Sequence, residues 1–440
     1  MRFAALCLLC VSAFSAGATT PLVDRTFGTN ANGLASVAVG QSASGNYLAS
    51  AGVQPDGKVL LFGQDFVGNG QSAYVARLNT DGSADTSFGE TATGSTNLGT
   101  AFNLRANVVG SNGDILFAGD DGSTINAVVG RLASGGALDQ SFHSSGYREL
   151  VPTAFGSIYA NSEFDAVFSL EDGKVLAVGY ALTTSVPSAC GIAAQFNSDG
   201  SLDSSFGNGS GSVCVAPPYS GAPIFEVTAA LRLSSGNIIL AGGADHTGGS
   251  NLDIAMTQLL PSGEIDTSFG NSGWVTFGYD AGGAFEDYAM SITSDSQNRL
   301  LLGVVYTTDQ GVAQAVMRYT STGQLDASFG INGISAVPGD ETLNLAPYGL
   351  WMLPGGNVMV ASISFNVGTA ILQLTEIDAN GQLASAFATD GTFNVSMPAG
   401  FDPTARPFAI GDYIYSSGPS SIAGLSALRL ILPIFNSGFD

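Results

Sequence analysis

The chain has 440 residues, of which 45% are hydrophobic and only 11% are charged, and its formal net charge is −23. Its 13 lysine and arginine residues face 36 acidic ones, so it lacks the clustered positive charge that binds nucleic acids and anionic membranes. We therefore expect no nucleic-acid partner.

The first 18 residues are typical of a secretory signal peptide. Met1-Arg2 precedes an apolar run from Phe3 to Phe14, and Ala16-Gly17-Ala18 forms a cleavage site after Ala18. The run is too short for a stable membrane span. We expect an exported protein, located in the periplasm, on the cell surface or outside the cell, without a membrane span.

A phrase that reads Leu-Asp-x-Ser-Phe-Gly, with variations, returns seven times along the rest of the chain. Its phenylalanines lie 61, 54, 64, 63, 60 and 58 residues apart. They are Phe27, Phe88, Phe142, Phe206, Phe269, Phe329 and Phe387. A regular period of this size indicates one supersecondary unit that is copied and stacked.

Each unit carries further short apolar runs. One follows an Asp-Gly or Asn-Gly turn, as in 53–63, and one precedes Leu-Asp, as in 74–79. A looser segment follows Phe-Gly, as in 273–280. Short apolar runs bounded by glycine favour strands, and Asp-Gly between them predicts a hairpin. The unit is predicted to have four antiparallel strands: A before the Asp-Gly turn, B after it, C before Leu-Asp and D after Phe-Gly.

Repeated four-stranded units predict a β-propeller, since propellers have about four to eight such blades. A solenoid is the alternative, but it would need capping ends. The chain starts with a D-like segment at 34–40 and finishes with A, B and C segments at 407–410, 411–418 and 425–432. Pairing them removes both exposed edges. We predict an all-β, seven-bladed propeller over residues 19–440, with the N-terminal strand completing the last blade.

These motifs, in this order, resemble the delta-60 repeat family. Residues 53–89 and 170–207 match it closely, and the resemblance extends from about residue 20 to the C-terminus. It implies a propeller-like fold in exported, mostly bacterial proteins, with no established catalytic activity. Three units depart from the pattern: Ala384 replaces the aspartate of the sixth, His143 replaces a glycine of the second, and the last unit ends in FNSGFD at 435–440.

Two cysteines, Cys190 and Cys214, remain after removal of the signal peptide. They flank the turn that contains Leu202, so they could face each other across the hairpin of strands C and D. In an exported protein this predicts a disulfide. The alternative is two separate buried thiols.

The repeated aspartates and phenylalanines are interpreted as structural, because an active site needs its residues only once. An aspartate in such a turn accepts hydrogen bonds from nearby backbone, and the phenylalanine would pack between blades. The residues are Asp85, Asp139, Asp203, Asp266, Asp326, Phe88, Phe142, Phe206, Phe269 and Phe329. The segments 79–85 and 197–203 faintly resemble calcium loops, but the distal glutamate of an EF-hand is absent.

No residue is assigned a catalytic, cofactor-binding or metal-binding role. The histidines His143 and His246 are too few for a typical histidine zinc site. The acidic pairs Glu286-Asp287 and Asp120-Asp121 are interpreted as chance pairs in an acidic protein. Five aromatic residues could form sugar-stacking platforms, but most of them are interpreted as packing residues: Tyr180, Trp274, Tyr306, Trp351 and Tyr413.

Two functions are carried forward. The first is a secreted, non-enzymatic propeller, expected to be monomeric and without cofactor, that binds or scaffolds a protein or glycan. The alternative is an exported polysaccharide hydrolase or lyase that uses carboxylates or His246 on one face. Convergence of unrepeated polar residues at one channel mouth would favour an enzyme, and scatter over the rim would favour binding.

Overall fold

The computed structural model describes residues 21–432 with short gaps. The gaps are 41–45, 68–69, 90–92, 100–101, 111–112, 184–187, 220–222, 246–251, 280–285, 310, 340–343, 365–370, 389, 396, 399–400, 402 and 420–423. The expected signal peptide and His246 therefore lie outside the described residues.

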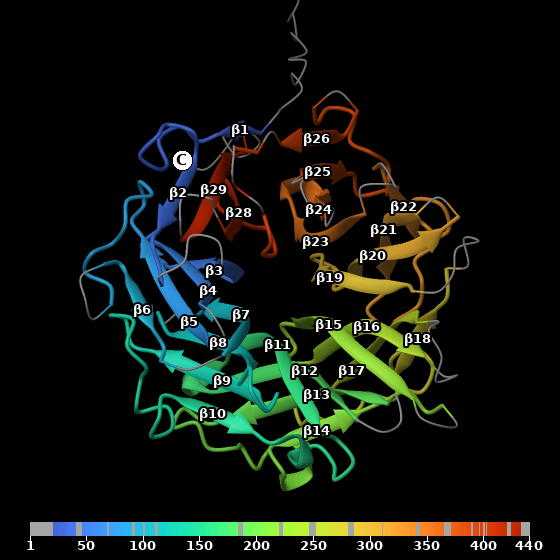
Figure 1. Ribbon diagram of the computed structural model, residues 1–440. Coiled ribbons are helices and arrows are strands. Elements are labelled where there is room, and N and C mark those ends of the chain that lie inside the picture. Colours follow the sequence, from blue (N-terminus) through green and yellow to red (C-terminus); the bar gives the residue numbers. More distant parts are fainter. Residues whose placement is uncertain are drawn as a thin grey trace, which may run out of the picture.

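The described residues form seven antiparallel sheets arranged as blades around a central axis (Figure 1). In the first six blades the strands run in chain order from the axis outwards. Blade 1 contains β3 (Asn46–Val53), β4 (Val59–Val67), β5 (Gly70–Leu78) and β6 (Ser95–Asn97). Blade 2 contains β7 (Asn103–Val109), β8 (Ile115–Asp120), β9 (Ala127–Leu132) and β10 (Tyr147–Leu150). Blade 3 contains β11 (Asn161–Ser169), β12 (Val175–Leu182), β13 (Ala189–Phe196) and β14 (Ser212–Val215).

The next three blades repeat this order. Blade 4 contains β15 (Ile224–Arg232), β16 (Ile238–Asp245), β17 (Asp253–Leu259) and β18 (Trp274–Phe277). Blade 5 contains β19 (Tyr288–Ser294), β20 (Leu300–Thr308), β21 (Gly311–Tyr319) and β22 (Ile334–Val337). Blade 6 contains β23 (Leu345–Met352), β24 (Val358–Ser364), β25 (Leu372–Ile377) and β26 (Thr392–Val395). The predicted A, B, C and D strands are thus confirmed.

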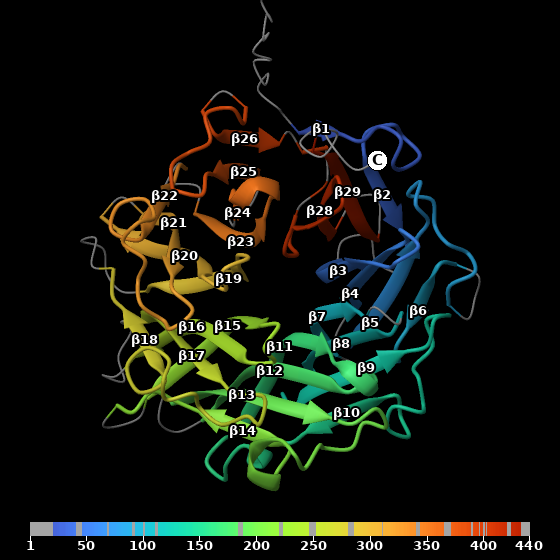
Figure 2. The same cartoon turned by 180° about the vertical axis from the view of Figure 1, so that it is seen from behind.

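Blade 7 combines both ends of the chain. It contains β27 (Phe408–Ile410), β28 (Tyr413–Pro419) and β29 (Leu425–Ile431), and two N-terminal strands, β1 (Leu22–Val23) and β2 (Leu34–Val37), pair antiparallel with β29. The blue N-terminal strands lie beside the red C-terminal ones in both views (Figures 1 and 2). The prediction of a closed ring of seven blades is confirmed, and the N-terminal contribution comes in two pieces.

Helical structure in the described residues is confined to short 3-10 turns: Pro152–Ala154, Glu171–Gly173, Gly207–Gly209 and Pro354–Gly356. No helix in this part of the chain has the length and apolar character needed to cross a membrane.

Hydrogen bonds link neighbouring blades at the Phe-Gly turns. The residue after the phenylalanine donates its backbone N–H to a carbonyl of the next blade, at 2.7–2.8 Å. The pairs are Gly28 to Asp81, Gly89 to Gly135, His143 to Asp199, Gly207 to Ser262, Gly270 to Thr322 and Gly330 to Asn380. His143 keeps this bond by adopting a φ of +56°, a conformation that usually favours glycine.

Candidate functional site in the central channel

The two faces of the propeller, one at each end of its axis, differ in their residues. Turns between strands A and B, and between C and D, lie at one end and carry the repeated motifs. The starts of the innermost strands and the ends of the second strands lie at the other, where the side chains differ from blade to blade. Any specific site should therefore be sought along the innermost strands and not at the repeated turns.

At the repeated end, Asp85 shows how the turns are built. Its carboxylate accepts hydrogen bonds from Arg77 Nε at 2.7 Å, Lys58 Nζ at 2.8 Å and Ser87 Oγ at 2.6 Å. Burial opposes ionisation, but the hydrogen bonds from Lys58 and Ser87 and the charge of Arg77 hold the pKa of Asp85 well below its usual range.

The other predicted aspartates have matching partners on strand C. Arg131 donates to Asp139 at 2.7 Å, Gln195 to Asp203 at 2.8 Å, Gln258 to Asp266 at 2.7 Å and Arg318 to Asp326 at 2.9 Å. Each carboxylate also accepts from the serine two residues later, through its N–H and its hydroxyl. These contacts support the predicted structural role, which remains a prediction.

The predicted phenylalanines are at most 1% exposed: Phe88, Phe142, Phe206, Phe269 and Phe329. Phe88 lies between blades 1 and 2, because a Cβ added to Gly136 of blade 2 would stand 2.6 Å from its ring. The Arg77 guanidinium lies 4.5 Å from the centre of the same ring. The phenylalanine, the arginine and the aspartate of one unit thus form a single packed group, with part of it reaching the next blade.

The segments that resemble calcium loops are closed by their own side chains. Asp81 Oδ1 accepts from the Ser83 N–H at 2.9 Å, and Asn79 Nδ2 donates to Ser83 Oγ at 3.0 Å. Among the described residues no group of three or more histidine, cysteine, aspartate or glutamate side chains could hold a metal ion.

Two cavities of about 370 and 420 Å³ occupy the axis of the ring, and the smaller one is lined by the innermost strands of all seven blades. The wall of the larger cavity includes Asn103 and Gln64, and the wall of the smaller cavity includes Trp351. Five residues line both cavities: Ala49, Arg105, Asp165, Tyr348 and Arg406. These five residues therefore lie at the boundary between the cavities.

The five boundary residues share one position in the repeat. The innermost strands of blades 1 to 6 each contain a β-bulge, at Ala49, Arg105, Asp165, Thr228, Met290 and Tyr348. Arg406 occupies the corresponding place before β27, where Thr404 and Ala405 both donate backbone N–H groups to the Ser417 carbonyl. Bulges redirect side chains and are frequent beside functional sites. We call these seven residues the channel ring.

Arg105 of the channel ring gathers three carboxylates. Its Nη2 donates to Glu163 Oε2 at 2.5 Å, its Nε donates to Asp120 Oδ2 at 3.2 Å, and its Nη1 lies 3.8 Å from Asp165 Oδ1. Asn103 Nδ2 donates to the second oxygen of Asp120 at 2.7 Å. Since Arg105 and Asp120 belong to blade 2 and the other carboxylates to blade 3, one guanidinium joins two blades at the channel.

Two of these carboxyl groups have raised pKa values. Burial raises the pKa of Glu163 to about 7, assisted by the charge of Asp165 and opposed by Arg105. Burial also raises the pKa of Asp165 to about 6, against the charges of Arg105 and Arg406. The Glu163 side chain is 8% exposed and that of Asp165 is 16% exposed. Both groups can therefore change protonation near neutral pH.

Only one of these carboxylates faces the cavities. Asp165 is the single acidic residue among the described residues that line them, whereas Glu163 and Asp120 lie behind the guanidinium of Arg105. Glycoside hydrolysis normally needs two carboxyl groups that flank the substrate. The walls described here offer one.

Arg406 extends across the channel. Its Nη2 donates to the backbone carbonyl of Thr228, so a side chain of blade 7 reaches blade 4. Its guanidinium carbon lies 5.8 Å from the ring centre of Tyr348. Because Arg406 lines both cavities, its side chain lies between them.

The candidates drawn from the sequence are dispersed. Asp120 belongs to the Arg105 group, while Asp121 accepts from the Thr124 N–H of its own loop at 2.9 Å. Asp287 accepts from the Tyr279 N–H at 2.8 Å. His143 lies at the repeated end, where its Nε2 is 3.2 Å from Arg148 Nη1.

The five aromatic candidates also lie at different places in the fold. Trp351 lines the smaller cavity, and Tyr180 lies close enough to Glu163 to influence its pKa. Trp274 packs against Phe225 at 5.0 Å between ring centres, Tyr306 against Tyr279 at 4.3 Å, and Tyr413 beneath Arg429 at 4.6 Å. Packing roles thus describe three of the five.

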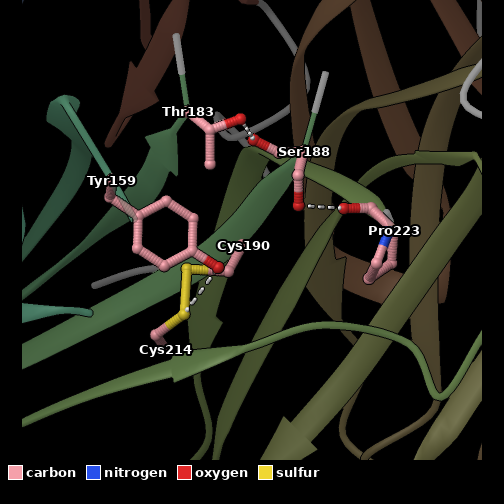
Figure 3. Close-up of a disulfide and its surroundings, with 6 residues drawn as sticks. All are labelled: Tyr159, Thr183, Ser188, Cys190, Cys214 and Pro223. Atoms are coloured by element: carbon pink, nitrogen blue, oxygen red, sulfur yellow. Dashed lines mark hydrogen bonds between the residues drawn. A yellow bond between two sulfur atoms is a disulfide. The ribbon is translucent and has the colours of Figure 1, made fainter. Parts of the chain in front are cut away.

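The disulfide between Cys190 and Cys214 is present, with the two Cα atoms 5.6 Å apart (Figure 3). Cys214 stands opposite Ile192 in the register, so the bond joins β13 to β14 diagonally. The Tyr159 hydroxyl lies 3.4 Å from Cys214 Sγ. The bond fastens the outer strand of blade 3 and lies away from the channel.

Comparison with known proteins agrees with this architecture. Residues 54–88, 170–206 and 233–269 match the family described as "Domain of unknown function (DUF5122) beta-propeller". Each matched segment starts at a turn between strands A and B and ends at the phenylalanine of the repeated phrase, Phe88, Phe206 or Phe269, and the description of the family agrees with the propeller fold. A search of the curated proteins finds no match.

Solved structures of similar fold are distant in sequence. A polysaccharide lyase described as a PL25 ulvan lyase has a TM-score of 0.51 at 10% identity, with 94% of each chain covered. The β-propeller domain of the Trilobed protease from Pyrococcus furiosus has a TM-score of 0.43 at 10% identity, with 90% of this chain and 98% of that chain covered. At these identities the likeness concerns the fold alone.

Proposed function

We propose that this protein is an exported, non-enzymatic propeller that binds a glycan in its central channel. The observation that carries the proposal is the convergence of unrepeated polar side chains on the channel ring, with Arg105, Asp165 and Arg406 at equivalent positions of different blades. Repeated polar residues fix turns at the opposite end, so this ring is where the chain departs from its own pattern.

The chemistry of the walls supports a polyhydroxylated ligand. The larger cavity presents amide, guanidinium and carboxylate groups from Gln64, Asn103, Arg105, Asp165 and Arg406, together with the ring of Tyr348. Such groups donate to and accept from hydroxyls, and an aromatic face packs against the C–H surface of a sugar. Both cavities have volumes within the range of about 300–1,000 Å³ typical of small-ligand sites.

By the criterion stated from the sequence, this convergence favours an enzyme, and an exported polysaccharide hydrolase or lyase is the alternative. Binding is preferred to hydrolysis because the described cavity walls contain a single carboxylate, Asp165.

Export is part of the proposal. The N-terminal sequence is typical of a signal peptide, and a disulfide is the usual mark of an oxidising compartment. We propose cleavage after Ala18 and a single domain over residues 19–440.

A glycan array tests the proposal. Mature protein (residues 19–440) should bind one glycan class, and Ala49→Phe, which fills the channel ring, should abolish binding. Ala379→Phe, the same substitution at an exposed turn of the opposite end, should leave binding unchanged. Binding that survives Ala49→Phe would place the site elsewhere, and new reducing ends or unsaturated products in the bound glycan would establish the enzyme.

A further inference from the structure

Asp165 has acceptor capacity that the described part of the chain does not use. Its Oδ2 is buried without a hydrogen-bond partner among the described residues. Its Oδ1 approaches Arg105 at 3.8 Å, which is too long for a hydrogen bond. A carboxylate offers about four acceptor sites, and this one lines both cavities. A ligand group that donates hydrogen bonds would satisfy it.

Arg406 has the complementary capacity. The guanidinium carries about five N–H donors, and in the described part of the chain one of them is used, toward the Thr228 carbonyl. The side chain is exposed and lines both cavities. A ligand group that accepts hydrogen bonds would satisfy the remaining donors.

The two groups together select the charge of the ligand. Above pH 6, the approximate pKa of Asp165, an anionic group would bind Arg406 but would meet the Asp165 carboxylate, and a cationic group would meet the opposite conflict. A hydroxyl both donates and accepts. Adjacent hydroxyls on a neutral unit can donate to Asp165 and accept from Arg406 without an uncompensated charge.

Arg406 also limits the length of the ligand. Because its side chain reaches from blade 7 to Thr228 of blade 4, it spans the channel at the ring. A polymer cannot pass through this point while the contact exists. The larger cavity, of about 420 Å³, has room for the end of a chain.

We infer that the protein recognises the terminus of a neutral saccharide chain, whose adjacent hydroxyls bridge Asp165 and Arg406. This inference rests on the proposed glycan-binding function. It makes Asp165 and Arg406 the residues that determine specificity.

Saturation-transfer NMR on the mature protein tests the inference with methyl glucoside, methyl galactoside and methyl mannoside as neutral probes. Methyl glucuronide and methyl glucosaminide serve as the acidic and basic probes. At least one neutral glycoside should bind more tightly than both charged ones. Asp165→Asn and Arg406→Met should each weaken it by at least tenfold, and Asp199→Asn, at an exposed repeated turn, should not.

The glycan array tests the proposed function, and the NMR titration tests the further inference, so their outcomes can be told apart. If the array shows binding that Ala49→Phe abolishes, but the charged probes bind as tightly or both ring variants behave as wild type, the inference is wrong and the proposed function stands. If the array is blank, both are wrong. Oligomers of the bound sugar, compared with the parent polymer at equal mass, should compete in proportion to their number of chain ends, and equal competition would overturn end recognition.

Discussion

Arg429 donates through Nε to the carboxylate of Asp24 at 2.7 Å, although 405 residues separate them in the chain. The side chains are 8% and 3% exposed. Arg429 also donates through Nη1 to the Thr80 carbonyl of blade 1 at 2.7 Å, and its guanidinium carbon lies 4.3 Å from the Phe27 ring centre. One side chain thus joins the last strand, the N-terminal segment and the first blade.

Removing the Asp24 carboxylate should open this closure. Asp24→Ala leaves Arg429 buried without its partner, and such a loss costs about 3–5 kcal/mol. Urea unfolding of the mature protein measures the change. Asp266→Ala is the matched control, because the equivalent Asp266 pairs with the neutral Gln258, so its loss leaves no buried arginine without a partner and should cost about 1 kcal/mol. Equal losses in the two variants would contradict a special role for the closure.

The disulfide should stabilise the mature protein by about 3 kcal/mol, since it closes a short loop in the unfolded chain. The Cys190→Ala/Cys214→Ala variant and the reduced wild type should both lose about this amount in urea unfolding. A thiol assay on denatured, unreduced protein should find neither cysteine reactive. Two reactive thiols would contradict the bond.

Glu163 should make stability fall as the pH rises. Its pKa in the folded protein is raised to about 7, whereas an unfolded glutamate titrates near 4. Between about pH 4 and 7 the unfolded state therefore binds fewer protons, and the free energy of unfolding decreases with pH. Glu163→Gln should reduce the difference in stability between pH 5 and pH 8. An unchanged difference would show that Glu163 is not the group responsible.

A glycine between blades should tolerate substitution less well than an open one. Gly381 and Gly355 have φ values of +82° and +87°. A Cβ at Gly381 would lie 2.2 Å from the backbone nitrogen of Gly330 in the neighbouring blade, whereas a Cβ at Gly355 would meet nothing within 4 Å. Gly355→Ala should cost about 1 kcal/mol from backbone strain alone, and Gly381→Ala roughly 2 kcal/mol more. Equal costs would contradict tight packing between the blades.

The fold could be predicted because every unit repeats the same local signals. Asp-Gly turns, short apolar runs and the Phe-Gly phrase recur in order, and strand pairing follows from their alternation. The sixth unit departs from the repeat at two paired positions. Ala384 replaces the aspartate, and Glu376 replaces the Arg or Gln that donates to this aspartate in the other units. The pair is thus lost as a unit and leaves no unpaired arginine.

The channel ring could not be predicted in the same way, because its seven members belong to six different residue types. Their common feature is position: Ala49, Arg105 and Asp165 each stand fourteen residues before Gly63, Gly119 and Gly179. Comparison of this position across the units would have shown that its residue type varies. This position faces the axis because of the bulge. The bulge is set by strand pairing and has no sequence signal of its own.

Protection of a cysteine in the channel ring tests the central claim most directly. With Cys190 and Cys214 joined, Ala49→Cys gives the mature protein one free thiol that faces both cavities. A saturating amount of the glycan identified on the array should slow its alkylation by iodoacetamide at least tenfold and leave that of Ala379→Cys unchanged. If the glycan binds and the thiol at position 49 reacts at the same rate, the channel is not the binding site.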